Sequence, residues 1–332
     1  MTGQPGPAQL EGASSRPRRI VVLSRSFSSH PVLRAELLAL YPGATFNDTG
    51  RTLAGRELLD FVAGHDGVVV ALEKLDGKTL AEMKDVRVIA KYGVGLDNID
   101  LKAAAELNIR VGWTGGSNRR SVAELAVGQM ILLVHRAHEA AGEVRSGVWR
   151  QLKGRELRNR TVGILGCGHV GKEVARLLRV FGCRVLAHDI RDFPEFYAAE
   201  QIVPVGLAEL LDRSEVLTIH LPYTAATRNM LDERALARLP DGAVVVNTAR
   251  GGILDEDALL ANLNSGHIDA AALDVFASEP PTNRELLLHP RLLATPHIGG
   301  SAEEAVLAMG RAAIAGLAEA SDPLRHIPMW AA

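Results

Sequence analysis

The stretch TVGILGCGHVGKEVARLL, residues 161–178, decides the fold. It joins an apolar run to a helical pattern through G-x-G-x-x-G, whose glycines are Gly166, Gly168 and Gly171. The first glycine permits a tight turn, the second lets a pyrophosphate approach the backbone, and the third lets helix and strand pack closely. The stretch therefore predicts a strand, a phosphate-binding loop and a helix that together hold a dinucleotide.

The residues after this loop indicate which dinucleotide it takes. The predicted helix starts at His169 and Val170, where unpaired N–H groups and the positive end of the helix dipole favour phosphate. The next apolar run ends at Asp189, in the place where an acid accepts hydrogen bonds from ribose hydroxyls. A carboxylate there repels a 2′-phosphate, which favours NAD. Arg191 lies two residues further on and leaves NADP open as an alternative.

Two series of apolar runs alternate with helical patterns, which is typical of α/β proteins with parallel sheets. The later series predicts six strands, the number in a doubly wound dinucleotide-binding sheet. They are expected at residues 161–166, 184–189, 216–221, 243–249, 268–276 and 292–298. The earlier series predicts strands at 19–24, 67–72, 87–93 and 110–113, with helices at 31–40, 78–83 and 101–107.

A long helical pattern, residues 121–147, separates the two series. Ser121 and Glu124 have the spacing of a capping box at its start. Its apolar part, from Val122 to Val134, is either buried in its own fold or covered by a partner subunit. A last helix is expected over residues 301–320.

Composition excludes several classes of protein. Hydrophobic residues are 47% of the 332 and charged residues 23%, which is an ordinary globular balance. With 37 Lys and Arg against 39 Asp and Glu, no basic excess indicates nucleic-acid binding. The two cysteines, Cys167 and Cys183, have no metal-ligand spacing, so we expect no metal site and free thiols in the cytoplasm. Long apolar runs are absent, so no membrane span is expected, and residues 1–18 have the composition of a flexible tail.

The chain resembles the D-isomer-specific 2-hydroxyacid dehydrogenase family, in particular its phosphoglycerate-dehydrogenase-like branch. Motifs that carry the likeness are KYGVGLDNIDL (91–101), SVAELAVGQM (121–130), the glycine loop, HLP (220–222), NTARGG (247–252), ALDVFASEPP (272–281) and ATPHIGG (294–300). The resemblance implies a Rossmann NAD-binding domain at residues 120–299. It also implies that this domain is inserted in a flavodoxin-like substrate domain, residues 19–119 and 300–332, with hinges near Asn118 and at Gly299–Gly300.

Three side chains suit hydride transfer to a 2-oxo acid. Arg250 follows the predicted strand 243–249, and its planar fork can pair with a carboxylate and polarise a carbonyl. His297 lies at the C-terminal end of another predicted strand, residues 292–298, and can exchange a proton near neutral pH. Glu279, placed beside that imidazole by the fold, would favour its protonated form and fix its orientation. Without context these would be a surface arginine, a structural histidine and a loop charge, but by resemblance all three match the family's catalytic residues.

The resemblance also implies the remaining contacts. The glycine loop, Asp189, Arg250 and His297 are expected to bind the cofactor. The further residues expected to bind it are Leu221, Pro222, Thr227, Thr248, Ala249, Asp274 and Gly300. Asp274 would accept a hydrogen bond from the carboxamide. Val94 and Gly95 would offer backbone N–H groups to the substrate carboxylate, and Lys74 is a further substrate candidate unless it is a solvated surface charge. Phosphoglycerate dehydrogenases carry an Arg-Ser pair where this chain has Ala71 and Leu72. Trp149 lies in a segment that tends to cross between subunits in the family, although a local core position is equally open.

These observations predict an NAD-dependent oxidoreductase that interconverts a small 2-oxo acid and its D-2-hydroxy acid, most simply as a homodimer. Two alternatives remain open. One is an oxidoreductase for another small oxyanion, such as phosphite or a phosphonate-bearing acid. The other is a non-enzymatic NAD-sensing binding protein, like the corepressor branch of the family.

Overall fold

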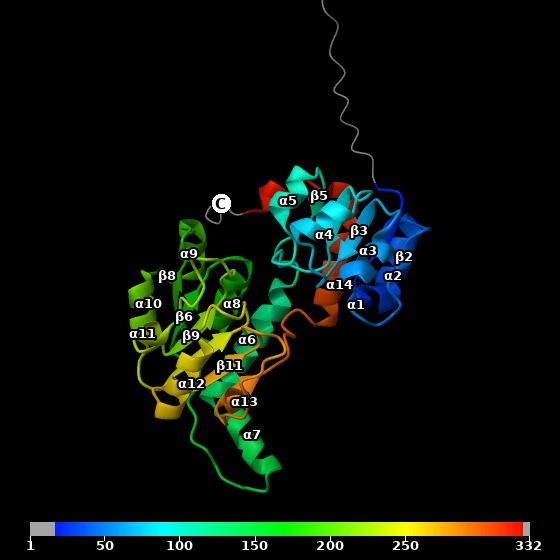
Figure 1. The fold of residues 1–332 in the computed structure, drawn as a ribbon. Helices are drawn as coiled ribbons and strands as arrows, with labels where there is room; N and C mark the ends of the chain where they lie inside the picture. Colours follow the sequence, from blue (N-terminus) through cyan, green and yellow to red (C-terminus); the bar gives the residue numbers. More distant parts are fainter. Residues whose placement is uncertain (1–16, 328–332) are drawn as a thin grey trace, which may run out of the picture. The chain divides into compact units, whose positions relative to one another are not determined.

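The computed structural model describes residues 17–327, which fall into two compact units (Figure 1). The inserted unit is residues 115–308, and the split unit combines the chain up to residue 114 with the chain from residue 309 onward. Both expected hinges therefore lie within the inserted unit as the structure divides the chain. Most of the expected tail, residues 1–16, is outside the described residues, and Arg18 donates its N–H to the Asp66 carboxylate at 2.9 Å.

The split unit contains a five-stranded parallel sheet in the order β2-β1-β3-β4-β5. This is the strand order of flavodoxin-like sheets. Its strands are β1 (Ile20–Val22), β2 (Thr45–Phe46), β3 (Gly67–Val70), β4 (Val88–Lys91) and β5 (Arg110–Gly112). Strands β1, β3 and β4 are buried along their whole length, which explains why they are apolar without alternation. The sequence reading missed β2.

Helices cover this sheet, and the last of them returns from the end of the chain. They are α1 (Arg25–Ser29), α2 (Pro31–Leu40), α3 (Gly55–Val62), α4 (Gly77–Glu82), α5 (Leu101–Glu106), the end of α14 (Glu303–Glu319) and the short 3₁₀ helix η1 (Pro323–His326). A Cβ on Gly112 would lie 2.2 Å from the carbonyl oxygen of Gly316, so α14 packs backbone to backbone against β5. The C-terminal segment is therefore part of the split unit, as the resemblance implied.

The inserted unit contains a seven-stranded parallel sheet in the order β12-β11-β10-β9-β6-β7-β8. The strands are β6 (Thr161–Leu165), β7 (Arg184–His188), β8 (Val203–Pro204), β9 (Val216–Ile219), β10 (Ala243–Asn247), β11 (Ile268–Leu273) and β12 (Leu292–Ala294). The order reverses between β6 and β9, as in a Rossmann fold, and such a switch point is where ligands bind. The expectation of six strands was wrong by one, because β8 forms a seventh at the edge.

The helices of the inserted unit follow its strands, apart from the first two. They are α6 (Arg119–Val134), α7 (Ala137–Arg145), α8 (His169–Val180), α9 (Pro194–Glu200), α10 (Leu207–Arg213), α11 (Glu233–Leu236), α12 (Glu256–Ser265) and α13 (Arg284–Leu287). Helix α6 packs against α8, β10 and β11 and buries Ala126, Met130 and Leu133 there. Its apolar face is thus covered by its own fold.

Two expectations about the long helical segment were wrong. The segment breaks into α6 and α7 at Arg136, whose φ is +55°. The capping box does not form either, because α6 begins at Arg119 with Asn118 as its N-cap, so Ser121 is already inside the helix. Ser121 instead donates its hydroxyl to the carbonyl oxygen of Gly299 at 2.5 Å, and Glu124 pairs with Arg120.

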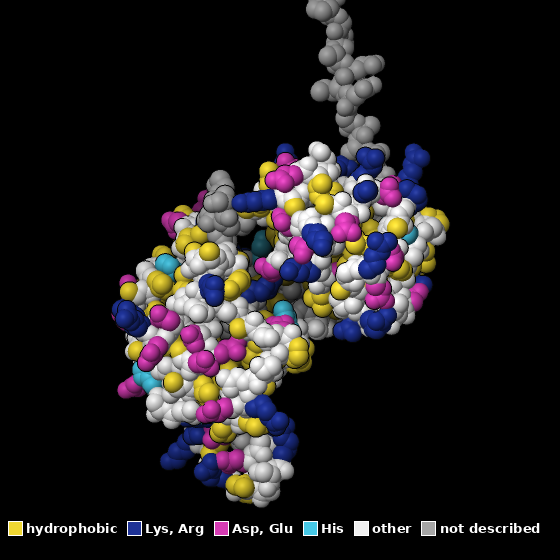
Figure 2. Space-filling model, viewed as in Figure 1, with side chains coloured by type: hydrophobic (Ala, Val, Ile, Leu, Met, Phe, Trp, Pro, Cys, Tyr) yellow, Lys and Arg dark blue, Asp and Glu magenta, His cyan; other side chains and the backbone are white. Residues whose placement is uncertain are grey.

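Charges of both signs are interspersed over the face shown in Figure 2, in keeping with the net charge of −2. Among residues 17–327, the helices are all too short or too polar to cross a bilayer.

Candidate active site

The glycine loop closes the end of β6 against the start of α8. Gly166 has a φ of +97°, and a Cβ on Gly171 would lie 2.1 Å from the Gly166 carbonyl oxygen. Helix and strand therefore pack too closely for a side chain at Gly171. A Cβ on Gly168 would have as its nearest described neighbour an atom of Arg191, 3.9 Å away. The loop thus keeps open space over Gly168, where a pyrophosphate can approach the amides of His169 and Val170.

Asp189, directly after β7, is fixed beside this loop. Its Oδ2 accepts the N–H of Cys167 at 2.8 Å, and its Oδ1 accepts the N–H of Arg191 at 2.9 Å. Each carboxylate oxygen can accept a second hydrogen bond, so the group keeps capacity for ribose hydroxyls. The Nε of Arg191 is 3.7 Å from Oδ1 of Asp189. Arg191, the residue that keeps NADP open as an alternative, therefore lies beside the carboxylate that disfavours NADP.

Three cations surround His169 at the start of α8. Partial burial, followed by the charges of Arg119, Arg191 and Lys172, lowers the pKa of His169 below its usual value. The imidazole is therefore neutral at neutral pH, while the three side chains and the helix end provide positive potential. This potential matches the two phosphates of a dinucleotide.

The expected groove residues Leu221, Pro222, Thr227, Thr248 and Ala249 follow the ends of β9 and β10. Thr227 donates its hydroxyl to the Pro222 carbonyl oxygen at 2.7 Å and accepts the N–H of Thr224 at 2.8 Å, which closes the turn after β9. The Thr248 hydroxyl is buried and makes no hydrogen bond to the described chain. These positions fit the wall of a cofactor groove, and Thr248 is the member with an unused polar atom.

Asp274, at the end of β11, holds the loop that carries His297. The side chain is 1% exposed. Its Oδ1 accepts the Thr295 hydroxyl at 2.6 Å and the N–H of Ile298 at 2.8 Å, and its Oδ2 accepts the N–H of Gly299 at 2.8 Å. In this structure the carboxylate therefore shapes the 295–299 loop, a role that we did not expect from the sequence. Its contact with a carboxamide stays a prediction.

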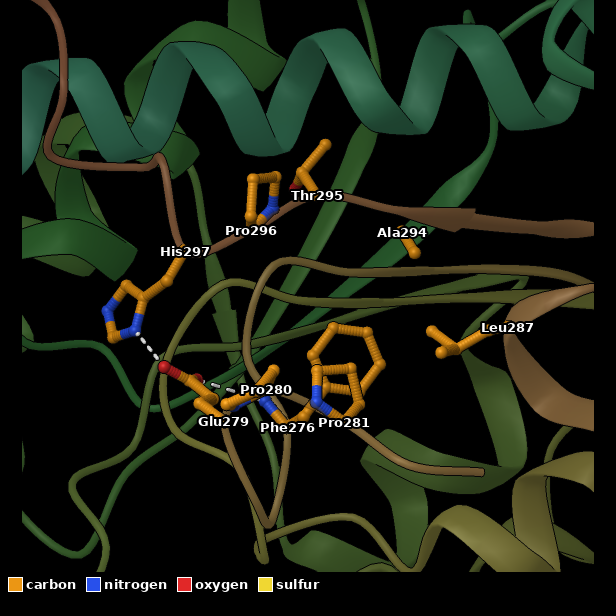
Figure 3. Close-up of a pocket in the computed structure, with 9 residues that line it drawn as sticks. All are labelled: Phe276, Glu279, Pro280, Pro281, Leu287, Ala294, Thr295, Pro296 and His297. Atoms are coloured by element: carbon orange, nitrogen blue, oxygen red, sulfur yellow. Dashed lines mark hydrogen bonds and ion pairs between the residues drawn. The ribbon is translucent and has the colours of Figure 1, made fainter. Parts of the chain in front are cut away.

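His297 and Glu279 lie side by side at the carboxyl edge of the sheet, after β12 and β11 (Figure 3). The Nδ1 of His297 is 2.8 Å from the Oε2 of Glu279. The other oxygen of Glu279 accepts the N–H of Phe276 at 3.1 Å, and this hydrogen bond fixes the position of the carboxylate. A pocket of about 410 Å³ opens beside the pair and is lined mainly by apolar residues of 276–281 and 294–297. The arrangement suits an oriented, proton-exchanging imidazole.

Arg250 lies in the turn after β10, next to the turn that carries Glu279. The Asn247 side chain donates to the Arg250 carbonyl oxygen at 3.0 Å, and the Arg250 Nη1 donates to Ala249 at 2.7 Å. A Cβ on Gly251 would lie 1.9 Å from the backbone of Phe276. The two turns are thus packed backbone to backbone, so one edge of one sheet carries Arg250, Glu279 and His297.

The other predicted substrate residues belong to the split unit. Val94 and Gly95 follow β4, and their N–H groups donate to no acceptor within residues 17–327. Lys74 is exposed in the loop between β3 and α4. Lys74 thus has the exposure of the solvated surface charge that the sequence left open, and the contact of the two amides with a carboxylate stays a prediction.

Comparisons with known proteins decide the family. Residues 127–299 match the family model "D-isomer specific 2-hydroxyacid dehydrogenase, NAD binding domain". The chain is 38% identical over 272 residues to a hydroxypyruvate reductase of Thermotoga maritima, covering 79% of this chain and 87% of that protein. The chain belongs to the D-isomer specific 2-hydroxyacid dehydrogenase family. It is also 35% identical over 258 residues to D-3-phosphoglycerate dehydrogenase of Homo sapiens, covering 77% of this chain but only 48% of that protein, so it spans about half that relative's length.

Solved structures of the family share the whole fold. A D-isomer specific 2-hydroxyacid dehydrogenase of Polaromonas sp. superposes with a TM-score of 0.83 at 30% identity, covering 91% of this chain and 95% of that one. D-lactate dehydrogenase of Aquifex aeolicus, solved with NAD and lactic acid, gives a TM-score of 0.78 at 25% identity, with coverages of 90% and 93%. The inserted unit is accordingly an NAD-binding domain, and its glycine loop, cations and Asp189 fit that cofactor.

Sequence reasoning missed two polar residues of this dehydrogenase site. Gln129 of α6 donates its side-chain amide to the Thr295 hydroxyl at 3.3 Å, and Thr295 donates to Asp274. Thr295 could have been suspected, because it lies within the ATPHIGG motif. Gln129 gives no such signal, since a polar residue in an apolar helix is recognisable as a partner only when the packing of α6 is known.

Proposed function

We propose that this protein interconverts a small 2-oxo acid and its D-2-hydroxy acid with NAD. The observation that carries the proposal is the 2.8 Å contact between His297 and Glu279, on the sheet edge that also holds Arg250. When bound, NADH supplies the hydride that reduces the carbonyl carbon. The remaining tasks, which are binding the carboxylate, polarising the carbonyl and protonating its oxygen, fall to side chains of this chain.

Each of the three side chains has one task. The Arg250 guanidinium pairs with the substrate carboxylate and stabilises the negative charge that develops on the carbonyl oxygen. His297 gives its proton to that oxygen as an alkoxide forms, and takes it back in the oxidative direction. Glu279 holds Nδ1 of His297, so that Nε2 is the nitrogen directed to substrate. Gly300 and the other groove residues serve the cofactor.

The substrate that we propose is small. Where phosphoglycerate dehydrogenases are expected to carry a cation, this chain has Ala71 and Leu72, and Lys74 is exposed in the same loop. A phosphate dianion in a water-excluding site needs charge-assisted partners. Glyoxylate, hydroxypyruvate and pyruvate need only a carboxylate site, and Val94 and Gly95 offer backbone N–H groups for one.

A substrate panel followed by NADH fluorescence tests the proposal. We expect turnover with at least one small 2-oxo acid, and a kcat/KM for 3-phosphohydroxypyruvate well below it. A higher kcat/KM for 3-phosphohydroxypyruvate would overturn the substrate class. Oxidation of phosphite with NAD, or of a phosphonate-bearing acid, would favour the alternative oxyanion activity. NADH binding without turnover of any compound would favour the NAD-sensing binder.

Variants of Arg250 test the carboxylate clamp. Arg250→Ala should lower kcat/KM by roughly a hundredfold or more, as expected when a group that stabilises developing charge is removed. Arg250→Lys keeps the charge but loses the planar fork, so it should recover only part of the loss. NADH affinity should stay within about twofold of wild type in both variants. Near-normal turnover by Arg250→Ala would refute the role.

We also propose that the protein is a homodimer formed through α7 and the segment after it. Helix α7 contributes no buried residue, and Figure 1 shows it extending away from the seven-stranded sheet. Trp149 is 85% exposed, so the alternative of a local core tryptophan is wrong. A second copy that covers this apolar surface would remove it from water.

A further inference from the structure

A buried lysine ends β4, directly beneath the loops that face the carboxyl edge of the five-stranded sheet. Lys91 is 6% exposed. Its ammonium donates to the Ala71 carbonyl oxygen at 2.5 Å and to the Asn98 side-chain oxygen at 2.6 Å. A charge taken out of water is costly unless such hydrogen bonds compensate it. Lys91 thus joins the loop after β3 to the loop after β4.

Two further side chains tie the same loops together. The Asn98 amide donates to the carbonyl oxygens of Ala71, at 3.1 Å, and of Glu73, at 2.6 Å. Glu73, 2% exposed, accepts the N–H of Ala71 at 2.8 Å. The backbone of Ala71 is therefore held at both its N–H and its carbonyl group. We name the loops 71–75 and 92–98, with the side chains of Lys91, Asn98 and Glu73, the lysine-linked loops.

The lysine stem also supports the backbone that leads to the predicted carboxylate site. Gly93 has a φ of +134°, and a Cβ there would lie 3.2 Å from Cε of Lys91. The next residue, Val94, has its carbonyl oxygen fixed by the indole N–H of Trp113 at 3.0 Å. Because Lys91 lies under one end of this short turn and Trp113 holds its middle, the directions of the Val94 and Gly95 amides depend on both.

We propose that Lys91 is a positioning residue for the substrate. It keeps the lysine-linked loops in one conformation, in which the Val94 and Gly95 amides can receive a carboxylate. The inference rests on the proposed function, since it concerns the same substrate. The inference goes beyond the proposed function because it assigns a task to Lys91, a cation that does not itself touch the reacting atoms. It also explains how this chain uses positive charge at a loop in which Ala71 and Leu72 carry none.

The decisive variant is Lys91→Met, which keeps the length of the stem and removes the ammonium. Hydrogen–deuterium exchange of the amides in residues 71–75 and 92–98 should become faster in the full-length protein without ligand. The KM for the best small 2-oxo acid should rise roughly tenfold to a hundredfold, because the loop conformation that receives the carboxylate loses the hydrogen bonds of a charged group. At saturating substrate kcat should stay within about threefold of wild type, and NADH affinity should not change. Lys84→Met, an exposed lysine of the same unit, is the matched control and should alter none of these.

Asn98→Ala removes the hydrogen bonds from the Asn98 amide to Ala71 and Glu73. It tests the proposal independently if Lys91→Met does not fold. It should raise the same KM and speed exchange in the same two loops, and Lys91→Arg, which keeps a cation, should lie between wild type and Lys91→Met. Unchanged exchange in the loops would overturn the proposal, and so would faster exchange with an unchanged KM. A wild-type protein that turns over no 2-oxo acid would refute the proposed function and the substrate role together, while the exchange data would still show whether Lys91 links the loops.

Discussion

His297 has an unusual backbone conformation that neighbouring residues hold in place. Its φ of +55° is a left-handed conformation that non-glycine residues rarely adopt. Asp274 accepts the N–H groups of both following residues, Ile298 and Gly299, and so holds the chain in this conformation. Such strain persists only where surrounding contacts impose it, and it is common at functional sites. The geometry of the imidazole is therefore set by a buried carboxylate as well as by Glu279.

Substitutions of the pair should separate proton transfer from orientation. His297→Ala should lower kcat by about 10²–10⁴-fold, the usual contribution of general acid–base catalysis. Glu279→Gln should lose less, because the amide can still bond to Nδ1 although it carries no charge. Single-turnover kinetics at saturating NADH would measure both. Equal losses in the two variants would mean that Glu279 does more than orient the ring.

Asp189 should determine the choice of cofactor. Its carboxylate is held beside the glycine loop and repels a 2′-phosphate, so NADH should be preferred over NADPH by kcat/KM. Asp189→Asn keeps the shape of the side chain and removes its charge. Because Arg191, 3.7 Å away, could then pair with a 2′-phosphate, the variant should have a smaller ratio of kcat/KM for NADH to kcat/KM for NADPH. Arg191→Gln in the same background should restore it. Equal use of both cofactors by the wild type would show that Arg191 already neutralises the phosphate.

At the scale of elements, strong local patterns were predictable and short or context-dependent ones were not. Helix α2 was predicted with its observed bounds, because Pro31 starts it and an apolar pattern follows. Strands β2 and β8 have two residues each, too few to show periodicity, and Pro204 is tolerated because β8 is an edge strand. At the break, Arg136 has a left-handed backbone and pairs with Glu139, a local arrangement that a helical pattern does not encode.

The site was predictable to the extent that it follows from strand ends. Arg250 was expected just beyond the predicted strand 243–249 and His297 at the end of the predicted strand 292–298, and the carboxyl ends of parallel strands share an edge. The place of Glu279 beside His297 was expected only from the family resemblance. The supporting contacts were not predictable, because they join residues far apart in sequence. Asp274 holding the His297 loop, and Gln129 reaching Thr295, require the packing of α6 against the sheet.

We expect His220, the residue after β9, to make the stability of the protein depend on pH. Burial lowers the pKa of His220 to about 3, its Nδ1 has no hydrogen-bond partner in the described chain, and its Nε2 is 2.9 Å from the Thr218 hydroxyl. The unfolded chain binds a proton at this residue below pH 6.5, whereas the folded protein does not. Stability is therefore lost as pH falls below that value, by up to about 2 kcal/mol at pH 5.

Urea unfolding of His220→Gln checks this expectation. The variant should lose less stability than the wild type between pH 7 and pH 5, because the group that the unfolded state protonates is gone. His135→Gln, at an exposed position before α7 and outside the proposed interface, serves as the control. An identical pH dependence in wild type and His220→Gln would show that burial of His220 does not govern it.

At the scale of the whole molecule, the connectivity makes each unit dependent on distant parts of the chain. The split unit needs the end of α14, since Gly316 lies against Gly112 and His326 lies 3.0 Å from the Val111 carbonyl oxygen. The inserted unit, by contrast, is continuous from residue 115 to residue 308. The family resemblance implied this insertion, with the units divided near residues 119 and 299, whereas the structure divides them at residues 114/115 and 308/309, because packing decides where each unit ends.

The exposed apolar residues of α7 and of the segment after it should decide the oligomeric state. Trp149, Val148 and Val144 are 85%, 48% and 51% exposed, and an apolar surface of this kind is stabilised when a partner removes it from water. Sedimentation equilibrium should therefore give twice the chain mass for the wild type and the single mass for Trp149→Glu, since a carboxylate cannot be buried there without a partner. Val180→Glu, an 86% exposed position on α8, is the matched control and should remain dimeric. A monomeric wild type, or a dimeric Trp149→Glu, would show that α7 and the following segment do not form the interface.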